Sequence, residues 1–286
     1  MTRRTSIILP ARNEAEALEG LLPEIKALNP DAEIIVVDDG STDDTKEVAS
    51  RHGVRVISHP YSMGNGAAVK SGARAATGEV LVFMDADGQH CPEDMSSLVE
   101  KFDEGFDMVV GARPVGTHAS PWRMFANLVY NRLASWITSH EIRDLTSGFR
   151  VVTAARFREF LYLLPNGFSY PTTITMAFFR SGYPVAYHPI SLNRRTGDSH
   201  IRLLRDGVKF FLIILRVGTL YSPLRIFFPT SVLFFLLGAG NYIYTYVTEV
   251  RFTNMSALLF IAAIMVFLIG LVSEQITYLI YQRKDG

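Results

Sequence analysis

Two long apolar runs near the end of the sequence constrain this chain more than any other feature. Residues 226–246 and residues 255–272 contain no charged side chain. Each run is close to the roughly 20 residues that a helix needs to cross the hydrocarbon core of a bilayer. Two buried core helices are the alternative, but the runs are uninterrupted and adjacent, which favours membrane spans. We therefore predict transmembrane helices at about residues 224–247 and 255–280.

The connector between these runs, residues 248–254, is short, so the two spans form a hairpin with both chain ends on one side. Arg283 and Lys284 follow the hairpin, and positive charge beside a span favours the cytoplasmic side. We expect an integral membrane protein in a lipid bilayer, with its main domain and both termini cytoplasmic. Gly238-Ala239-Gly240 permits close helix approach, so the sequence is compatible with a homo-oligomer formed through the transmembrane helices.

Two amphipathic patterns precede the hairpin. In residues 200–222 the cations at positions 202, 205, 209 and 216 fall within one sector of a helical wheel, opposite apolar residues. A basic face on an apolar helix beside a membrane span suits anionic headgroups, which predicts an interfacial helix. The apolar residues between Phe125 and Ile137 also recur at helical spacing. This second helix fits either packing on the core or lying at the membrane surface.

The first 199 residues alternate short β-branched runs with helical patterns. We expect strands at 6–9, 34–37, 54–57, 80–84 and 108–110, and helices at 14–28, 42–52, 65–76 and 92–102. This alternation predicts an α/β domain with a mainly parallel sheet and helices on both faces. Such sheets bind ligands beyond the carboxyl ends of their strands. We divide the chain into an α/β domain (1–199), an interfacial helix (200–222) and a transmembrane hairpin with its tail (223–286).

Charge and cysteine content exclude several classes of function. The 28 lysines and arginines balance 28 aspartates and glutamates, so no basic field points to a nucleic-acid partner. The single cysteine, Cys91, excludes an internal disulfide and a cysteine-rich zinc site.

The sharpest local pattern is an apolar strand that runs into two carboxylates. Residues 80–84 lead directly into Asp85 and Asp87. In extended geometry alternate side chains share a face, so these two can converge, and Gln89 extends the same row. Converging oxygens suit Mg²⁺ or Mn²⁺, with phosphate oxygens completing the coordination. An acidic turn that only closes a strand is the alternative, because a single D-x-D is common.

A second expected strand, residues 34–37, also ends in acids, at Asp38 and Asp39. It would lie beside the end of the first strand, Pro10 to Glu14, so the polar groups of both ends could bond ribose hydroxyls or a base edge. Ser41 or Thr42 followed by acids is also an ordinary helix N-terminus, and both interpretations can hold together.

Gly64-Asn65-Gly66 resembles part of a dinucleotide-binding fingerprint. It lacks the third glycine and does not follow the first strand, which argues against a dehydrogenase. We interpret it as a helix entry near a phosphate or a sugar.

Three later segments carry arginine. They are Arg113 after an expected strand, the run from Arg143 to Arg150 with Ser147 inside it, and Arg194 just before the membrane segments. Arginine and hydroxyl groups that converge at strand ends form phosphate sites. Each segment alone is more often surface charge. Together with two acidic strand ends, they indicate two phosphate sites flanking a metal.

Taken in order, these motifs resemble family 2 glycosyltransferases of the GT-A fold, specifically the polyprenyl-phosphate hexose synthases. Dolichyl-phosphate mannose synthases and bacterial undecaprenyl-phosphate glycosyltransferases are the nearest types. The resemblance covers essentially the whole chain and rests on residues 10–14, 36–41, 85–90, 111–113, 146–150 and 194–199. It implies a GT-A, Rossmann-like sheet and an inverting transfer of a hexose from a GDP- or UDP-sugar to dolichyl or undecaprenyl phosphate, with Mg²⁺ or Mn²⁺ as cofactor.

The resemblance also implies roles for individual residues. The nucleotide would be held by Pro10, Asn13, Glu14, Asp38, Asp39 and Asp85. The metal and diphosphate would be held by Asp85, Asp87 and Gln89. The acceptor phosphate would be held by Arg113, Arg143 and Ser147, and Arg194 would reach phosphate charge as the site closes. Phosphate is already anionic near neutral pH, so no obligatory general base is expected, although Asp87 or Asp144 could tune the site. The chain departs from its relatives at Ala11-Arg12, His200 and Thr172-Thr173, the last being where we place the choice of sugar.

Two other functions are compatible with part of the sequence. A membrane glycosyltransferase acting on another lipid or on a polysaccharide is one, but processive synthases usually add an acceptor signature and further spans, and neither is present. A non-catalytic nucleotide-binding membrane scaffold is the other, but a scaffold needs neither a metal nor two phosphate sites.

Overall fold

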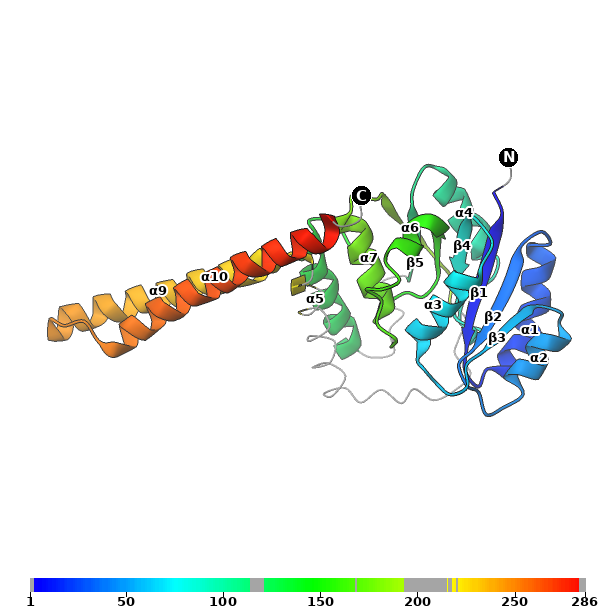
Figure 1. Cartoon of the computed structure of the whole chain (residues 1–286), viewed down its shortest axis with the longest axis horizontal. Helices are drawn as coiled ribbons and strands as arrows, with labels where there is room; N and C mark the ends of the chain where they lie inside the picture. Colours follow the sequence, from blue (N-terminus) through cyan, green and yellow to red (C-terminus); the bar gives the residue numbers. More distant parts are fainter. Residues whose placement is uncertain are drawn as a thin grey trace. The chain divides into compact units, whose positions relative to one another are not determined.

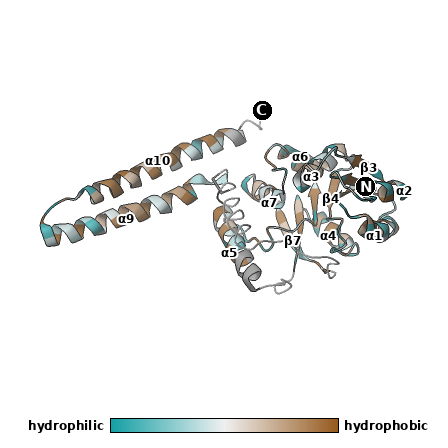
Figure 2. Cartoon of the chain, turned by 90° about the horizontal axis from the view of Figure 1, so that it is seen from below, coloured by the Kyte–Doolittle hydropathy of each residue, from teal (hydrophilic) through white to brown (hydrophobic). Residues whose placement is uncertain are grey.

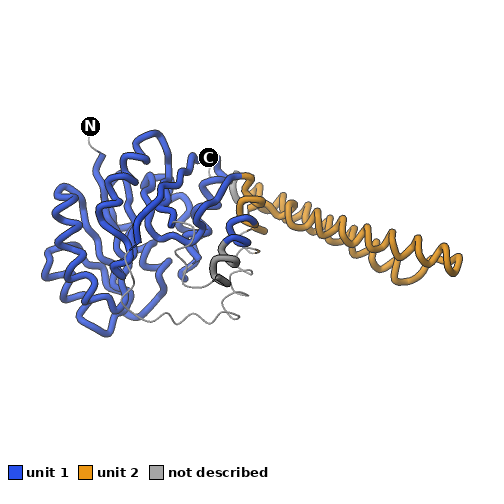
Figure 3. Tube along the Cα trace, turned by 180° about the vertical axis from the view of Figure 1, so that it is seen from behind, with its two compact units in different colours: residues 1–132, 140–208 blue, residues 133–139, 209–286 orange. Residues whose placement is uncertain are grey.

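The computed structural model describes residues 3–113, 121–167, 169–192, 215, 218–219 and 221–282, with the main chain alone for 121–127 and 280–282. The chain separates into two compact units. The first comprises Met1–Arg132 and His140–Val208, and the second Leu133–Ser139 and Lys209–Gly286 (Figure 3).

The described part of the first unit contains one seven-stranded sheet (Figure 1). Its strands are β1 (Thr5–Ala11), β2 (Glu33–Asp38), β3 (Arg55–Ser58), β4 (Val80–Phe83), β5 (Met108–Ala112), β6 (Arg150–Thr153) and β7 (Val185–Pro189), in the order β3-β2-β1-β4-β6-β5-β7. Every neighbouring pair is parallel except the two that involve β6. The predicted α/β class and the five predicted strands are confirmed, whereas β6 and β7 were not predicted.

Helices alternate with these strands. They are α1 (Ala15–Leu28), α2 (Thr45–Arg51), α3 (Asn65–Ala75), α4 (Asp94–Asp103), α5 (Pro121–Thr138), α6 (Ala154–Glu159) and α7 (Tyr170–Arg180). The four helices predicted between strands are confirmed, with small shifts at their ends. A helix over the apolar stripe near residue 130 is confirmed as α5.

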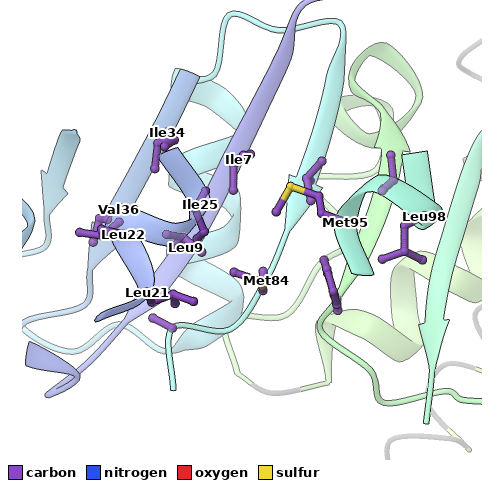
Figure 4. Packing of buried hydrophobic residues seen from close by; sticks show 14 of the residues in the cluster. Ile7, Leu9, Leu21, Leu22, Ile25, Ile34, Val36, Met84, Met95 and Leu98 are labelled. Carbon is purple, nitrogen blue, oxygen red and sulfur yellow. The ribbon is translucent and has the colours of Figure 1, made fainter. Parts of the chain in front are cut away.

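The core places helices on both faces of the sheet. Ile7 and Leu9 of β1 cluster with Leu22 of α1 and with residues of α2 and α4 (Figure 4). The alternate residues of the strands point to the opposite face, where the ring of Phe83 lies 4.6 Å from that of Phe157 in α6. Because both faces are covered, the edge formed by the strand ends is the part of the sheet that remains open to a ligand.

The second unit contains two long apolar helices, α9 (Pro223–Glu249) and α10 (Asn254–Gln282). Both are long and apolar enough to cross a membrane, and only 11 % of the most apolar stretch of α9 and 17 % of that of α10 is buried. The core helices of soluble proteins are mostly buried, so this exposure favours the predicted spans. Figure 2 shows the connector in teal and much of both helices in brown.

The two helices pack against each other through small residues. A side chain at Gly238 would lie 3.2 Å from Leu259 and Phe260 of α10, so this glycine serves packing within the hairpin. Glu274 of α10 accepts a hydrogen bond at 3.3 Å from the backbone N–H of Leu224, one of the groups at the start of α9 that has no partner within its own helix. The predicted hairpin is confirmed.

Arg225 joins the last turn of α5 to the start of α9 within this second unit. Its Nη1 donates to the carbonyl oxygens of Trp136 and Ile137 at 2.8 and 3.0 Å, and to the Oγ of Ser139 at 2.6 Å. These carbonyls lack partners inside α5, so the guanidinium caps the helix and complements its negative end. The interfacial helix predicted at 200–222 lies largely outside the described residues.

Candidate active site

A pocket of about 390 Å³ opens at the carboxyl ends of β1, β2 and β4. It is closed by the start of α3, the turn after β4, the loop before β6 and the start of α7. Its lining consists of Pro10, Ala11, Arg12, Glu14, Asp39, Ser62, Gly64, Asn65, Ala68, Asp85, Ala86, Asp87, Thr146, Gly148, Tyr170 and Pro171. This is the edge where a mainly parallel sheet binds its ligands.

The two acids after β4 both line this pocket, as expected. The backbone N–H of Gln89 donates to Oδ1 of Asp87 at 3.1 Å and closes the turn. Gln89 itself is not among the described residues that line the pocket. Asp85 packs against Gly148, where a Cβ would lie 2.5 Å from its Oδ2. The turn after β4 and the loop before β6 are therefore in direct contact.

Asp85 and Asp87 fit a divalent cation that is shared with a nucleotide. Among the described residues no group of three or more His, Cys, Asp or Glu side chains is arranged to hold a metal alone. Mg²⁺ and Mn²⁺ in nucleotide sites usually take one or two carboxylates, and phosphate oxygens and water fill the other positions. Two adjacent acids at the pocket wall match that requirement.

Asp39 organises one wall of the pocket. Its Oδ1 accepts hydrogen bonds from His59 Nδ1 at 2.7 Å and the Met63 N–H at 2.8 Å, and its Oδ2 from Ser62 Oγ at 2.9 Å and the Gly64 N–H at 2.8 Å. Burial alone would raise the pKa of Asp39, but these bonds outweigh it and lower the pKa. Four donors occupy the carboxylate, which fixes the loop before α3.

The loops after β1 and β2 are bonded to each other. Asn13 has a positive φ of 56°, and its Oδ1 accepts from the Thr42 N–H at 2.8 Å. Asp43 accepts from the N–H of Ala15 at 3.1 Å, at the start of α1. Asn13 and the buried Asp38 are outside the pocket lining, whereas Pro10 and Glu14 are part of it. Two of the residues predicted to bind the nucleotide, Asn13 and Asp38, thus hydrogen-bond the loops behind the pocket wall and do not line the pocket.

Arg113 pairs with Asp144 in a two-point ion pair. Nε of Arg113 donates to Oδ2 at 2.7 Å and Nη2 donates to Oδ1 at 2.9 Å. Nη2 also donates to Oγ1 of Thr146, which lines the pocket. Burial would raise the pKa of Asp144 and lower that of Arg113, yet the pair reverses both directions. The guanidinium therefore positions Thr146 at the pocket wall.

The other residues predicted for the acceptor phosphate lie in different surroundings. Ser147 is buried, and its Oγ has no hydrogen-bond partner. Arg143 is exposed, with its Nε 3.0 Å from Oε1 of Glu141. Neither is among the residues described as lining the pocket. Arg194 lies outside the described residues.

The glycines before α3 allow a close approach between two backbone segments. A Cβ at Gly64 or Gly66 would collide with the carbonyl oxygens of Asn166 or Pro165. Lys70 holds the same loop, since its Nζ donates to the carbonyl of Leu164 at 3.0 Å. The predicted helix entry is confirmed.

Sequence reasoning missed the lining residues Ser62, Tyr170 and Pro171. The proline at the start of α7 was the available signal, because proline favours the first turn of a helix. Thr172 and Thr173, expected to select the sugar, are buried and outside the pocket lining.

Comparison with known proteins follows the division of the chain. The model of glycosyl transferase family 2 matches residues 6–162, and the model of the GtrB C-terminal hairpin matches residues 222–279. Polyprenol monophosphomannose synthase of Mycolicibacterium smegmatis is 32 % identical over 213 residues, covering 68 % of this chain and 79 % of its own length. Dolichol-phosphate mannosyltransferase of Pyrococcus furiosus is 37 % identical over 160 residues, covering 51 % of this chain and 45 % of its own.

Among solved structures, glucosyl-3-phosphoglycerate synthase of Mycobacterium tuberculosis superposes with a TM-score of 0.62 at 23 % identity, covering 76 % of this chain and 80 % of its own. That likeness confirms the GT-A fold expected from the sequence. The family model includes the acidic turn after β4 and the loop before β6. Because it covers more than half of the chain, the chain belongs to family 2 of the glycosyltransferases.

Proposed function

We propose that this chain is an inverting glycosyltransferase that moves a hexose from a GDP- or UDP-sugar to a polyprenyl phosphate at the cytoplasmic face of a membrane. One observation carries the proposal. The acidic turn with Asp85 and Asp87 and the hydroxyl-bearing loop with Thr146 line the same pocket. A donor diphosphate and an acceptor phosphate would thus share one site.

The donor side of the pocket suits a nucleoside diphosphate with a divalent cation. Asp85 and Asp87 would hold Mg²⁺ or Mn²⁺, which neutralises the charge that develops on a departing diphosphate. A solved structure of the M. tuberculosis synthase holds Mn²⁺ and UDP. Pro10 and Glu14 would bind the nucleoside beside the wall that Asp39 fixes. Arg12, the cation among the described lining residues, is placed to meet phosphate or base.

The acceptor side suits a phosphate monoester. Such a group has a second pKa of about 6 and is largely dianionic at neutral pH, so it needs positioning more than deprotonation. Thr146 lies at the wall, where its Oγ1 accepts from Arg113 and donates to Oδ1 of Asp144 at 3.2 Å. It would donate to the phosphate by turning its hydroxyl away from Asp144. Arg143 and Ser147 would reach it only with a change from the described arrangement, and Arg194, which lies outside the described residues, stays a prediction. Attack opposite the leaving diphosphate inverts the anomeric carbon.

The choice of a lipid acceptor rests on the second unit and on the relatives. α9 and α10 suit a bilayer, and two curated relatives are named polyprenol monophosphomannose synthase and dolichol-phosphate mannosyltransferase. Membrane anchoring would keep the enzyme where such an acceptor is concentrated.

A transfer assay tests the proposal. Purified full-length protein in detergent is given Mg²⁺ or Mn²⁺, a short polyprenyl phosphate and a panel of labelled GDP- and UDP-sugars, and the lipid phase is extracted. We expect label in the lipid phase with one donor, lost on chelation and in Asp87→Ala. Hydrolysis alone, or label in an aqueous polymer, would contradict the lipid acceptor. Full activity in Asp87→Ala would contradict the metal assignment.

A further inference from the structure

Arg150 is a cation without a counter-ion in the interior of the first unit. It opens β6, has none of its surface exposed, and is among the largest fully buried side chains. Arginine stays charged even when buried. Within the described residues it forms no ion pair with a carboxylate, in contrast to Arg113, which is paired with Asp144. A buried charge of this kind is costly, so its partners should reveal what it does.

Two of its partners belong to separate segments of the pocket wall, and a third, Sδ of Met108 in β5, lies 3.8 Å from Nη1. Nη2 donates to the carbonyl oxygen of Ser147, between the lining residues Thr146 and Gly148. Nη1 donates to the carbonyl oxygen of Pro171 at 3.3 Å, in the first turn of α7. One side chain therefore bonds the loop before β6 to the start of α7.

Two further contacts fix the guanidinium in this position. Oγ1 of Thr175, one turn along α7, accepts from Nη1 at 3.3 Å and itself donates to the carbonyl of Pro171 at 2.8 Å. The ring of Tyr170, which also lines the pocket, lies 5.8 Å from the guanidinium carbon. Arginine's planar fork holds such a set of acceptors in one geometry, which a lysine ammonium does not reproduce.

The same segment retains polar groups that its own fold does not satisfy. Nε of Arg150 and Oγ of Ser147 are both buried and have no hydrogen-bond partner. Burial lowers the pKa of Arg150, and the nearby carboxylates Asp144 and Asp85 oppose that shift. Buried polar groups are nearly always paired, so an unpaired charge beside an unpaired hydroxyl marks a segment shaped for something besides stability.

We propose that Arg150 is a positioning residue for the acceptor side of the site: it bonds Ser147 to Pro171 and so holds Thr146 where the acceptor phosphate binds. This inference rests on the proposed function. Its buried positive charge also favours an anion at that wall. In the sheet, β4 and β1 separate Arg150 in β6 from the acids that follow β2, on the nucleoside side of the site. Asp85 lies closer, because it follows β4, the neighbour of β6, and packs against Gly148. We therefore expect Arg150 to affect the acceptor more than the donor.

Kinetics of three variants of the full-length protein test this. With short polyprenyl phosphate and the donor that wild type uses, Arg150→Met should raise the acceptor KM about tenfold. The donor KM should rise by no more than about threefold, a smaller effect that reaches the donor through the contact of Gly148 with Asp85. Arg150→Lys should recover part of the loss, because it keeps the charge without the fork. Thr175→Val, which keeps Arg150, should show a smaller rise of the same kind. Equal changes in both KM values, or none, would overturn the proposal.

Val152→Ala is the matched control for stability. Val152 is fully buried in the same strand but takes no part in these bonds. It should lower the unfolding temperature and leave the acceptor KM unchanged. If Val152→Ala raised the acceptor KM as much as Arg150→Met, the role would be structural only and the proposal would be wrong.

Hydrogen exchange gives a readout independent of transfer. In Arg150→Met and Thr175→Val, peptides covering residues 144–148 and 169–172 should exchange faster than in wild type, while those covering β1 and β2 should not. Unchanged exchange in both segments would overturn the positioning role. If wild type transfers no sugar to lipid, the proposed function fails, and the exchange result still decides whether Arg150 holds the two segments together.

Discussion

Gly148 has no room for a side chain, because the carboxylate of Asp85 occupies the space where a Cβ would be. Gly148→Ala should displace Asp85 or the loop before β6. We expect kcat/KM for the nucleotide-sugar to fall about 100-fold, the usual cost of moving a reacting group by about 1 Å. Steady-state kinetics over a range of Mg²⁺ concentrations would measure it.

Gly20→Ala is a suitable control for that substitution. Gly20 lies in α1, and a Cβ there meets nothing within 4 Å. Its activity should equal that of wild type. Wild-type efficiency in Gly148→Ala as well would show that the position of Asp85 against this loop does not matter.

Asp144 makes stability depend on pH. The Arg113 pair and backbone N–H groups lower its pKa in the folded protein despite burial. Its contribution is therefore complete above the unfolded pKa of about 3.9 and is lost as the pH falls through the lower folded value. Asp144→Asn should cost about 3 kcal/mol at pH 7, because it leaves Arg113 unpaired.

Thermal unfolding of the detergent-solubilised protein measures this loss. At pH 7 the variant should unfold about 6–12 °C below wild type. The difference should narrow once the pH falls below about 4, where the carboxyl of the unfolded wild-type chain begins to be protonated while the folded carboxyl, with its lowered pKa, stays ionised. Asp103→Asn, at an exposed pair with Arg3, should change little at any pH. A difference that stayed constant down to pH 3 would contradict the assigned pKa direction.

At the scale of single residues, the sequence predicted which residues lie at the pocket better than it predicted their hydrogen-bond partners. Four residues predicted for the site line the pocket, namely Asp85, Asp87, Pro10 and Glu14. They could be predicted because apolar runs locate the strand ends. The hydrogen-bond partners of Asp39 lie about 20 or more positions away along the chain, and no local pattern marks such pairings. The assigned roles of all these residues stay predictions.

At the scale of elements, the parallel strands were predictable and β6 was not. β1, β2 and β4 are runs of buried apolar residues ending in polar turns. β6 has only four residues and begins with Arg150, a residue that sequence patterns assign to the surface. Its burial depends on acceptors from α7, which are brought to it only by the complete fold.

The cap on α5 can be tested at the same scale. Arg225→Ala removes two hydrogen bonds to the last turn of the helix and a third to Ser139, just beyond its end. Their net loss should cost about 1–1.5 kcal/mol locally, so amides of residues 134–139 should exchange about tenfold faster. Arg251→Ala, in the exposed connector, should leave that segment unchanged. Equal protection in Arg225→Ala would mean that packing alone holds the turn.

At the scale of the whole molecule, the single cysteine permits a direct test of membrane topology. A membrane-impermeant maleimide applied to intact cells should not label the wild-type protein at Cys91, and should label it after permeabilisation. A Cys91→Ser, Glu249→Cys variant should be labelled in intact cells, because residue 249 ends α9 at the connector. The opposite pattern would place the catalytic unit outside and contradict the cytoplasmic assignment.

β6 runs against its neighbours, so the chain enters it at the edge of the sheet where β4 and β5 end. The pocket residues up to Asp87 come before β5 in the chain, and Thr146, Gly148, Tyr170 and Pro171 come after β5. Under the proposed function, donor and acceptor recognition would then occupy consecutive stretches of the gene. Recombination between Asp87 and Thr146 would exchange the residues that recognise the acceptor and keep those that recognise the donor. The segment between Asp87 and Thr146 is therefore the boundary at which an evolving enzyme could change its acceptor and keep its donor.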